Sequence, residues 1–335
     1  MSAPEVSILL PAYNAGATLD ACLRSVVRQT FPRWECIVVD DGSEDGTRAV
    51  AERFAAHDER FRVVATAHQG LVAALGTGLE RCLGRMVARM DADDVMHRER
   101  LAAQLRALDA EPALAAVGCH VRLFPRRELS DGLRAYERWL DGIDSPRRVR
   151  AEAFVECPVA HPTLMVRTDV LRAAGYRDEH WPEDYDLVLR LLGQGREIGV
   201  VPRRLLAWRD GPRRLWRAGE AYRPERFTAC KAAFLAAHFL AGADRYVLWG
   251  YGPTGRALRR ALARHGKRPS HVVEVHPGRI GEIIHGAPVI SVDELRAHPR
   301  RPLVAAVAGE RPRREIRDAL SALGFRETQD FVCAA

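Results

Sequence analysis

The chain has 335 residues, 47% hydrophobic and 28% charged, and is long enough to bury the cores of two globular domains. Its longest apolar stretch, 232–243, is interrupted by His238 and is too short to span a bilayer. The first residues given show no basic-then-apolar signal pattern, so we expect a cytoplasmic protein. The net charge of +7 comes from arginines spread along the chain without a nucleic-acid-binding motif, which argues against a nucleic-acid partner.

Two residue types need separate comment. The seven cysteines are odd in number and widely scattered, without a Cys-x-x-Cys pair, so we expect buried thiols rather than a disulfide framework or a zinc site. A denser arginine group predicts a patch that faces phosphates or acidic lipid headgroups, which leaves peripheral contact with the inner face of a membrane open. The group consists of Arg203, Arg204, Arg209, Arg213, Arg214 and Arg217.

The first third of the chain alternates between predicted strands and helices. A strand at 6–10 enters a turn-rich segment, and Thr18 is placed to cap a helix that runs to about Val27. A strand at 35–39, a helix at 47–57 and a strand at 62–65 follow. This alternation predicts a parallel sheet with helices on both faces, in which ligands bind beyond the carboxyl ends of the strands.

The next predicted strand ends in an acidic run, Arg89-Met90-Asp91-Ala92-Asp93-Asp94. Three carboxylates in four residues raise one another's pKa, and a hard divalent cation such as Mg²⁺ or Mn²⁺ would remove that repulsion. The alternative is a solvated acidic turn before the helix that starts near Arg98. Two other strand ends carry polar or aromatic residues, at 11–13 and 40–43, and their convergence favours the metal site.

Two residues at those strand ends suit a nucleotide base. Tyr13 provides a flat aromatic face for stacking, and Asp41 can accept the imide hydrogen of a uracil or a ribose hydroxyl. Either residue alone would be an ordinary turn residue. The interpretation therefore depends on their occurring together with the acidic run.

These motifs together resemble those of the family 2 glycosyltransferases, inverting enzymes of the GT-A fold, over about the first two thirds of the chain. The resemblance implies that Tyr13 and Asp41 hold the base, that Asp91 and Asp93 form the Asp-x-Asp motif, and that Asp93 is the direct metal ligand. His68 and Thr77 depart from the asparagines usual in the family. The matching segments are Pro11-Ala12-Tyr13-Asn14, Gln29-Thr30, Asp40-Asp41-Gly42-Ser43-Glu44-Asp45-Gly46-Thr47, His68-Gln69-Gly70 and Asp91-Ala92-Asp93-Asp94, which place Pro11, Gly70 and Asp91 on the donor side.

A second segment of the resemblance contains Glu183 and Asp184 at the start of a predicted helix. As a structural feature, this pair favours the helix dipole. The resemblance implies that Asp184 is the base that takes the acceptor proton, with Glu183 orienting it or holding acceptor hydroxyls. His161 and Trp181 are candidates for acceptor contact, although His161 could equally be a packed loop residue. The segment 123–156 is expected to lie over the acceptor cleft and shape acceptor choice.

The pattern changes after residue 217. A helix opening at Pro224 predicts a connecting arm, and a smaller α/β domain follows, with the turn Gly250-Tyr251-Gly252-Pro253-Thr254-Gly255 between a strand and a helix. Glu274 lies where a dinucleotide site places its ribose-binding acid. Pro253 removes one amide from the turn and Tyr251 is bulky, so we expect the segment from about Gly242 to Ala335 to fold independently and to bind NAD(H) weakly or not at all.

The sequence thus predicts an α/β protein with a GT-A catalytic domain at 1–217, a helical arm at 218–242 and a Rossmann-like accessory domain at 243–335. The predicted activity is metal-dependent, inverting transfer of a sugar from a nucleotide-sugar donor to a hydroxyl on a glycan or lipid-linked acceptor. A UDP-sugar is favoured as the donor over a GDP- or dTDP-sugar. An NAD(P)-dependent oxidoreductase or redox sensor and an inactive nucleotide-sugar-binding scaffold are the alternatives. The presence of both Asp-x-Asp and Glu-Asp favours the enzyme, and the sequence does not indicate an oligomeric state.

Overall fold

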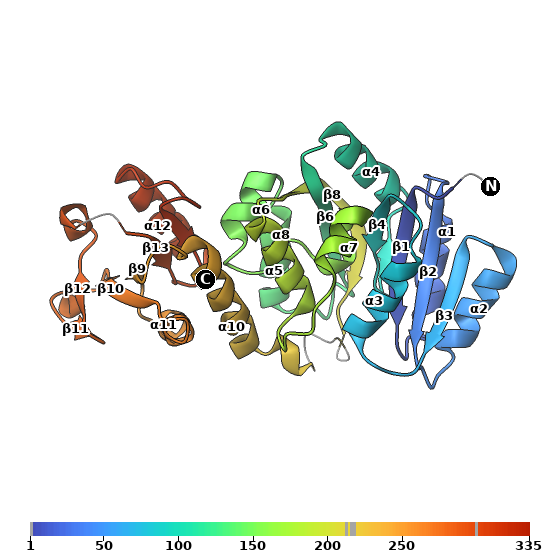
Figure 1. The fold of residues 1–335 in the computed structure, drawn as a ribbon, viewed down its shortest axis with the longest axis horizontal. Helices are drawn as coiled ribbons and strands as arrows, with labels where there is room; N and C mark the ends of the chain where they lie inside the picture. Colours follow the sequence, from blue (N-terminus) through green and yellow to red (C-terminus); the bar gives the residue numbers. More distant parts are fainter. Residues whose placement is uncertain (1–2, 212–213, 215–218, 299–300) are drawn as a thin grey trace. The chain divides into compact units, whose positions relative to one another are not determined.

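The computed structural model describes residues 3–211, 214, 219–298 and 301–335 (Figure 1). Contacts divide the chain into two compact units. The first comprises Met1–Val149, Val159–Glu179 and Arg190–Arg214, and the second comprises Arg150–Pro158, His180–Leu189 and Leu215–Ala335. The predicted domain boundary between residues 217 and 218 lies outside the described residues.

The first unit is built on an eight-stranded sheet with the order β3-β2-β1-β4-β7-β6-β8-β5. Strands β3, β2, β1 and β4 are parallel, as the alternating sequence predicts. Beyond β4 the sheet is mixed, because β7 is antiparallel to both β4 and β6, β5 is antiparallel to β8, and β6 is parallel to β8. The strands are β1 (Val6–Ala12), β2 (Trp34–Asp41), β3 (Phe61–Thr66), β4 (Met86–Arg89), β5 (Val95–Met96), β6 (Leu114–Phe124), β7 (Met165–Arg167) and β8 (Glu197–Arg209).

Helices cover both faces of this sheet, as expected. Ile8 and Leu10 of β1 belong to one buried cluster with Leu19 and Leu23 of α1. Leu9 points to the opposite face, where a Cβ on Gly78 of α3 would lie 2.3 Å from its Cδ1. The helices associated with this unit are α1 (Leu19–Val27), α2 (Thr47–His57), α3 (Leu71–Arg81), α4 (Arg100–Ala110), α5 (Asp131–Asp141), α6 (Pro146–Glu152) and α7 (Thr168–Ala174). The last three residues of α6 belong to the second unit.

The second unit contains a six-stranded sheet with the order β11-β12-β10-β9-β13-β14. Only β11 runs antiparallel to its neighbour, and the five parallel strands follow the order 3-2-1-4-5, as in doubly wound α/β sheets. The strands are β9 (Arg245–Trp249), β10 (Arg268–Val273), β11 (Ile283–Ile284), β12 (Ala287–Ile290), β13 (Leu303–Ala305) and β14 (Phe331–Cys333); the helices are α10 (Pro224–Phe234), continued by a π-helical turn at Leu235–Phe239, α11 (Pro253–Ala263) and α12 (Glu310–Ala322).

The first turns of α8 (Glu183–Gly193) also belong to the second unit. The fully buried hydroxyl of Tyr185 donates a hydrogen bond to the carbonyl oxygen of Ala153 at 2.7 Å, and the Tyr185 ring lies 5.7 Å from that of Phe227 in α10. Glu152 is buried and pairs with Arg317 at 2.9 Å. The predicted catalytic helix and the C-terminal sheet are therefore parts of one packed unit.

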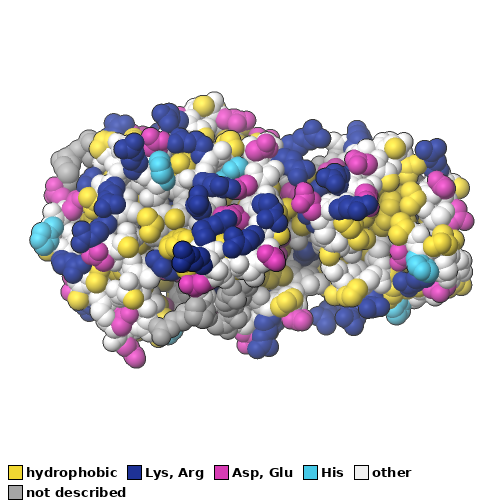
Figure 2. Space-filling model, turned by 180° about the vertical axis from the view of Figure 1, so that it is seen from behind, with side chains coloured by type: hydrophobic (Ala, Val, Ile, Leu, Met, Phe, Trp, Pro, Cys, Tyr) yellow, Lys and Arg dark blue, Asp and Glu magenta, His cyan; other side chains and the backbone are white. Residues whose placement is uncertain are grey.

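Three composition-based expectations can be compared with the structure. All seven cysteines are buried and free, as predicted. Among the described residues, no helix combines the length and the apolar character needed to cross a membrane. Figure 2 shows Lys and Arg side chains in scattered groups on the face in view, with acidic side chains among them.

The arginine group does not form one patch in the part of the chain that the structure describes. Arg203 pairs with Glu99, and Arg204 pairs with Asp141 at 2.7 Å. Arg209 and Arg214 contact the acidic run instead. Arg213 and Arg217 lie outside the described residues.

Candidate active site

The carboxyl ends of β1, β2 and β4 lie side by side. In the parallel registers, Ala12 is opposite Asp40 and Leu9 is opposite Arg89. Tyr13 therefore follows one strand, Asp41 ends its neighbour on one side, and the acidic run follows its neighbour on the other. The strand alternation predicted this arrangement, and the structure confirms it.

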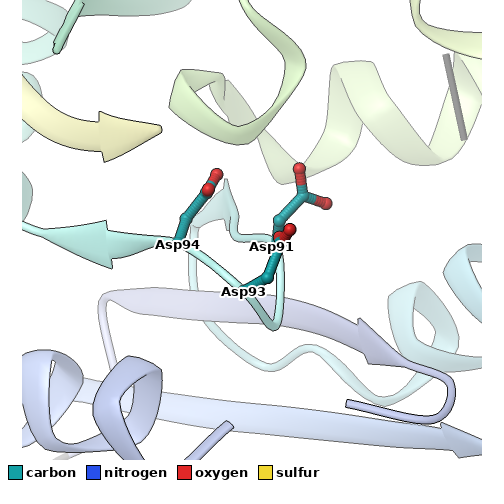
Figure 3. Close-up of side chains that lie close together, drawn as sticks. All are labelled: Asp91, Asp93 and Asp94. Carbon is teal, nitrogen blue, oxygen red and sulfur yellow. The ribbon is translucent and has the colours of Figure 1, made fainter. Parts of the chain in front are cut away.

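Asp91, Asp93 and Asp94 form a compact acidic cluster. Each offers one carboxylate oxygen, and these oxygens lie within 4.8 Å of one another. Figure 3 shows the three side chains projecting from one turn, to the same side of it. Asp94 is fully buried, and its Oδ2 atom has no hydrogen-bond partner among the described residues.

Charges around the cluster act unequally on its members. Burial raises the pKa of Asp93 and that of Asp94, the latter well above its usual range, and the negative charge of Asp91 raises both further. Burial, the largest influence on Asp91, also acts to raise its pKa, but Arg89 at 2.6 Å, Arg214 at 3.6 Å and His161 together lower it. Asp91 is thus held as a carboxylate, while its neighbours gain stability by sharing a cation or a proton.

The backbone of the acidic turn is fixed by groups from elsewhere in the sheet. The backbone N–H of Arg209 donates to Asp94 Oδ1 at 2.8 Å, and its guanidinium Nε donates to the carbonyl oxygen of Asp93 at 2.8 Å. The expected cap by Thr18 is absent: its hydroxyl accepts no helix N–H and instead donates to the carbonyl oxygen of Ala92 at 3.1 Å. The sequence did not reveal Arg209 and Thr18 as supports of this turn, because these partners are distant along the chain.

The cluster suits a hard divalent cation. Its donors are carboxylate oxygens, which Mg²⁺ and Mn²⁺ prefer. The unpartnered Oδ2 of Asp94 and the mutual repulsion within the cluster are the features that a bound cation would relieve. The structure therefore brings together the predicted ligands Asp91 and Asp93 and adds the buried Asp94.

The predicted base-binding residues are also adjacent, but Asp41 already has partners. Its Oδ1 accepts the backbone N–H of Gln69 and its Oδ2 accepts that of Gly70, both at 2.9 Å. The imidazole of His68 lies against Tyr13, with ring centroids 4.0 Å apart and an interplanar angle of 18°. Pro11 is a buried residue of β1, so it shapes the strand end rather than an open surface.

His161 lies inside the first unit, at the start of a short 3₁₀ turn, His161–Thr163. It is only 7% exposed, and its Nε2 atom lies 3.2 Å from the hydroxyl of Tyr176. It is also one of the groups that lower the pKa of Asp91. Its position therefore favours support of Asp91 over direct contact with an acceptor.

Glu183, Asp184 and Trp181 lie at the start of α8, in the second unit. Burial raises the pKa of Asp184 well above its usual range, and the neighbouring charges of Glu183 and Glu156 add to this. The Oδ1 atom of Asp184 accepts the backbone N–H of Tyr185 at 2.7 Å, and Glu183 accepts a hydrogen bond from the Tyr222 hydroxyl. Trp181 is partly exposed, and its indole N–H donates to Asp186 at 3.2 Å. A carboxylate with a raised pKa at a helix start can act as a general base near neutral pH.

The glycine-rich turn after β9 has the geometry of a close strand–helix connection. A Cβ on Gly255 would lie 2.1 Å from the carbonyl oxygen of Gly250, so the glycine at 255 permits α11 to approach the strand end. Tyr251 is buried in the core of this sheet rather than crowding the turn. Glu274, the expected ribose acceptor, pairs with Arg279 at 3.4 Å.

Comparison with known proteins adds to this geometry. The sequence model of the family described as Glycosyl transferase family 2 matches residues 7–173. EpsE of Bacillus subtilis is 32% identical over 200 residues, which cover 58% of this chain and 69% of EpsE. The UDP-Glc:alpha-D-GlcNAc-diphosphoundecaprenol beta-1,3-glucosyltransferase WfgD of Escherichia coli is 37% identical over 101 residues, which cover 30% of this chain and 39% of WfgD.

Solved structures show the same fold at lower identity. TarS 1-349 of S. aureus in complex with UDP-GlcNAc aligns with a TM-score of 0.57 and 18% identity, over 78% of this chain and 72% of that one. The mannosyltransferase PcManGT of Pyrobaculum calidifontis in complex with GDP-Man and Mn²⁺ aligns with a TM-score of 0.53 and 21% identity, over 79% and 70% of the two chains. The extent and identity of the match to EpsE show that the chain belongs to glycosyl transferase family 2, and it is a glycosyltransferase of the GT-A fold.

Proposed function

We propose that this glycosyltransferase transfers a sugar from a UDP-sugar to a hydroxyl group, with inversion at the anomeric carbon, in the synthesis of a polysaccharide or cell-surface glycan. The observation that carries this proposal is the acidic cluster, which follows β4 and so lies at the same sheet edge as the ends of β1 and β2. A candidate cation site and a candidate base-binding site therefore lie at one edge. The named activity of WfgD supports a UDP-sugar donor and a lipid-linked acceptor. The GDP-Man complex of PcManGT shows that the same fold also accepts another nucleotide.

On the donor side, Tyr13 and Asp41 would hold the base, and Pro11 and Gly70 would shape the pocket around it. Asp93 and Asp91 would hold a divalent cation, Mn²⁺ or Mg²⁺, with Asp94 beside them. A cation at that position would stabilise negative charge on the diphosphate as it leaves. Arg89 and Arg214 already lie next to Asp91, so positive charge is concentrated where the diphosphate is expected.

On the acceptor side, Asp184 would be the general base. The acceptor hydroxyl oxygen forms a bond to the anomeric carbon, the bond from that carbon to the diphosphate oxygen breaks, and the hydroxyl proton passes to Asp184. Its raised pKa supports this role, since a general base is most effective when its pKa lies near the operating pH. Glu183 would orient Asp184 or hold acceptor hydroxyls, and Trp181 would stack on a sugar ring.

The C-terminal sheet, with the strand order of a Rossmann-like domain, would position the start of α8 rather than bind a dinucleotide. The contacts of Tyr185 with Ala153 and Phe227, and of Glu152 with Arg317, support this role. The ion pair between Glu274 and Arg279 weighs against a ribose at the usual position. Within the described residues, the features that favour NAD(P)-dependent redox chemistry are the glycine-rich turn, the strand order and the position of Glu274, and Arg279 already occupies the last of these.

Thermal unfolding with UDP-, GDP- and dTDP-sugars, each with and without Mn²⁺, tests the proposal. A ligand present at a hundred times its Kd should stabilise the protein by about 2.7 kcal/mol. We expect stabilisation by UDP-sugars that depends on the metal, together with slow donor hydrolysis. Metal-independent stabilisation, or stabilisation by GDP- or dTDP-sugars alone, would contradict the metal or the donor respectively.

A further inference from the structure

The imidazole of His68 occupies the place expected for the nucleotide base. Its ring is stacked on Tyr13, with centroids 4.0 Å apart and planes 18° from parallel. Its Nδ1 atom lies 2.9 Å from Asp41 Oδ2 and 3.1 Å from the Asp41 carbonyl oxygen. Stacking on Tyr13 and contact with the Asp41 carboxylate are the two interactions proposed above for a uracil base.

A base cannot enter between the two rings as they stand. Two stacking contacts of about 3.5 Å each would require centroids about 7 Å apart, whereas the Tyr13 and His68 centroids are 4.0 Å apart. Asp41 is likewise engaged, because it accepts the backbone N–H groups of Gln69 and Gly70 as well as contacting His68. A base that stacks on the Tyr13 face covered by His68 and also contacts Asp41 must therefore displace the imidazole.

The local structure permits that displacement. The backbone beside His68 is fixed, since the N–H groups of Gln69 and Gly70 are bound to Asp41. Gly42, at a φ of +70°, allows the loop to approach closely, because a Cβ on residue 42 would lie 2.6 Å from the backbone nitrogen of His68. The His68 side chain itself is 51% exposed, so no core packing holds it. The imidazole can rotate into solvent while both backbone hydrogen bonds to Asp41 remain.

We propose that His68 occupies the base site when the donor is absent and swings out when a uracil base binds. This inference rests on the UDP-sugar donor proposed above. The competition lowers the apparent affinity for the donor, because only molecules with the imidazole displaced can bind it. In both states the Asp41 carboxylate keeps the backbone N–H groups of Gln69 and Gly70, so displacing the imidazole leaves neither of its oxygens unpaired.

Binding measurements on the full chain test the proposal. Calorimetric titration with UDP in the presence of Mn²⁺, and with uridine alone, would compare the wild type with His68→Ala. Because an aromatic pair contributes modestly beyond its buried area, His68→Ala should bind both ligands roughly two- to tenfold more tightly. His57→Ala is the matched control: it removes another exposed imidazole, one that contacts the carbonyl oxygen of Arg53 in α2, so its affinities should match those of the wild type.

A second readout follows the imidazole directly. Comparing the NMR spectra of the wild type and His68→Ala assigns the His68 ring signal, because it is the histidine signal that the variant lacks. Stacking on Tyr13 should shift this signal upfield, and saturating UDP should remove that shift. Equal or weaker UDP binding by His68→Ala, or an unchanged His68 signal with UDP bound, would refute the inference alone. Failure of UDP and uridine to bind any variant would refute the proposed donor and this inference with it.

Discussion

Replacing Asp184 by asparagine separates the proposed base from the residues that hold the donor. The amide oxygen of asparagine can still accept the backbone N–H of Tyr185, which Asp184 accepts at 2.7 Å, so the start of α8 should keep its structure. The substitution removes the basic lone pair without changing the size of the side chain. Turnover should fall by roughly 10²- to 10⁴-fold, a rise in the activation barrier of about 2.7–5.5 kcal/mol.

The pH dependence of turnover gives the more specific test. Asp184 must be deprotonated to take the acceptor proton, and burial and the charge of Glu183 raise its pKa well above the ordinary value of 3.8. The rate should therefore fall as pH is lowered through this raised pKa, closer to neutrality than for an exposed aspartate. Asp184→Asn should lose this acidic limb and retain only the slow residual rate.

The assay is transfer at saturating donor between about pH 4 and 9, a range that brackets ordinary and raised carboxyl pKa values, with donor affinity measured separately. Glu179→Gln is the control, since it neutralises an exposed carboxylate in the preceding loop, and it should behave as the wild type. A loss of donor affinity as large as the loss of rate would place Asp184 in the wrong role. An unchanged acidic limb in Asp184→Asn would assign that limb to another group.

Three further predictions concern the cation, the second unit and the glycine-rich turn. Asp93→Asn should abolish transfer and the Mn²⁺-dependent stabilisation by UDP in thermal unfolding, and retained metal-dependent binding would rule out its role as a ligand. Arg317→Met should lower the free energy of unfolding in urea by about 1–3 kcal/mol, because it breaks a pair with the buried Glu152, whose charge Arg313 at 3.8 Å still partly compensates, whereas Arg311→Met at an exposed pair should cost about 0–1 kcal/mol. The full chain should give no NAD⁺ or NADH binding in calorimetry; micromolar binding that is lost in Gly252→Val, where an added Cβ meets nothing within 4 Å, would revive the oxidoreductase alternative.

The parallel half of the first sheet was predictable because its signals are local. The apolar runs of β1, β2 and β4 each end in polar residues, and the predicted helix 47–57 has the observed bounds of α2. The short antiparallel strand β5 and the long strands β6 and β8 were not predicted. β8 has a mixed sequence, in which Arg203 and Arg204 are exposed between buried segments. β5 is only two residues long, and β6 is a nearly continuous buried run, which periodicity alone does not distinguish from a buried helix.

The partners of the site residues were less predictable than the residues themselves. Local sequence places Asp91 after a strand, but it does not show that Arg214, more than a hundred positions later, lies 3.6 Å away. It also does not show that Thr18 binds the acidic turn instead of capping its own helix. Such contacts depend on which strands become neighbours, and strand order in a mixed sheet is a property of the whole fold.

The properties of Asp184 depend on the second unit in the same way. Burial raises its pKa, and the backbone around it is held by Tyr185, which bonds to the segment 150–158. That segment is in turn fixed to the C-terminal sheet, because Lys231 donates to the carbonyl oxygens of Val155 at 3.1 Å and Ala334 at 2.8 Å. Asp184 is partly exposed, and loosening these contacts would let more water reach it and lower its pKa toward the ordinary value, which would weaken it in the proposed role of base. The C-terminal domain can therefore affect catalysis without binding a ligand, through the solvation of one carboxylate.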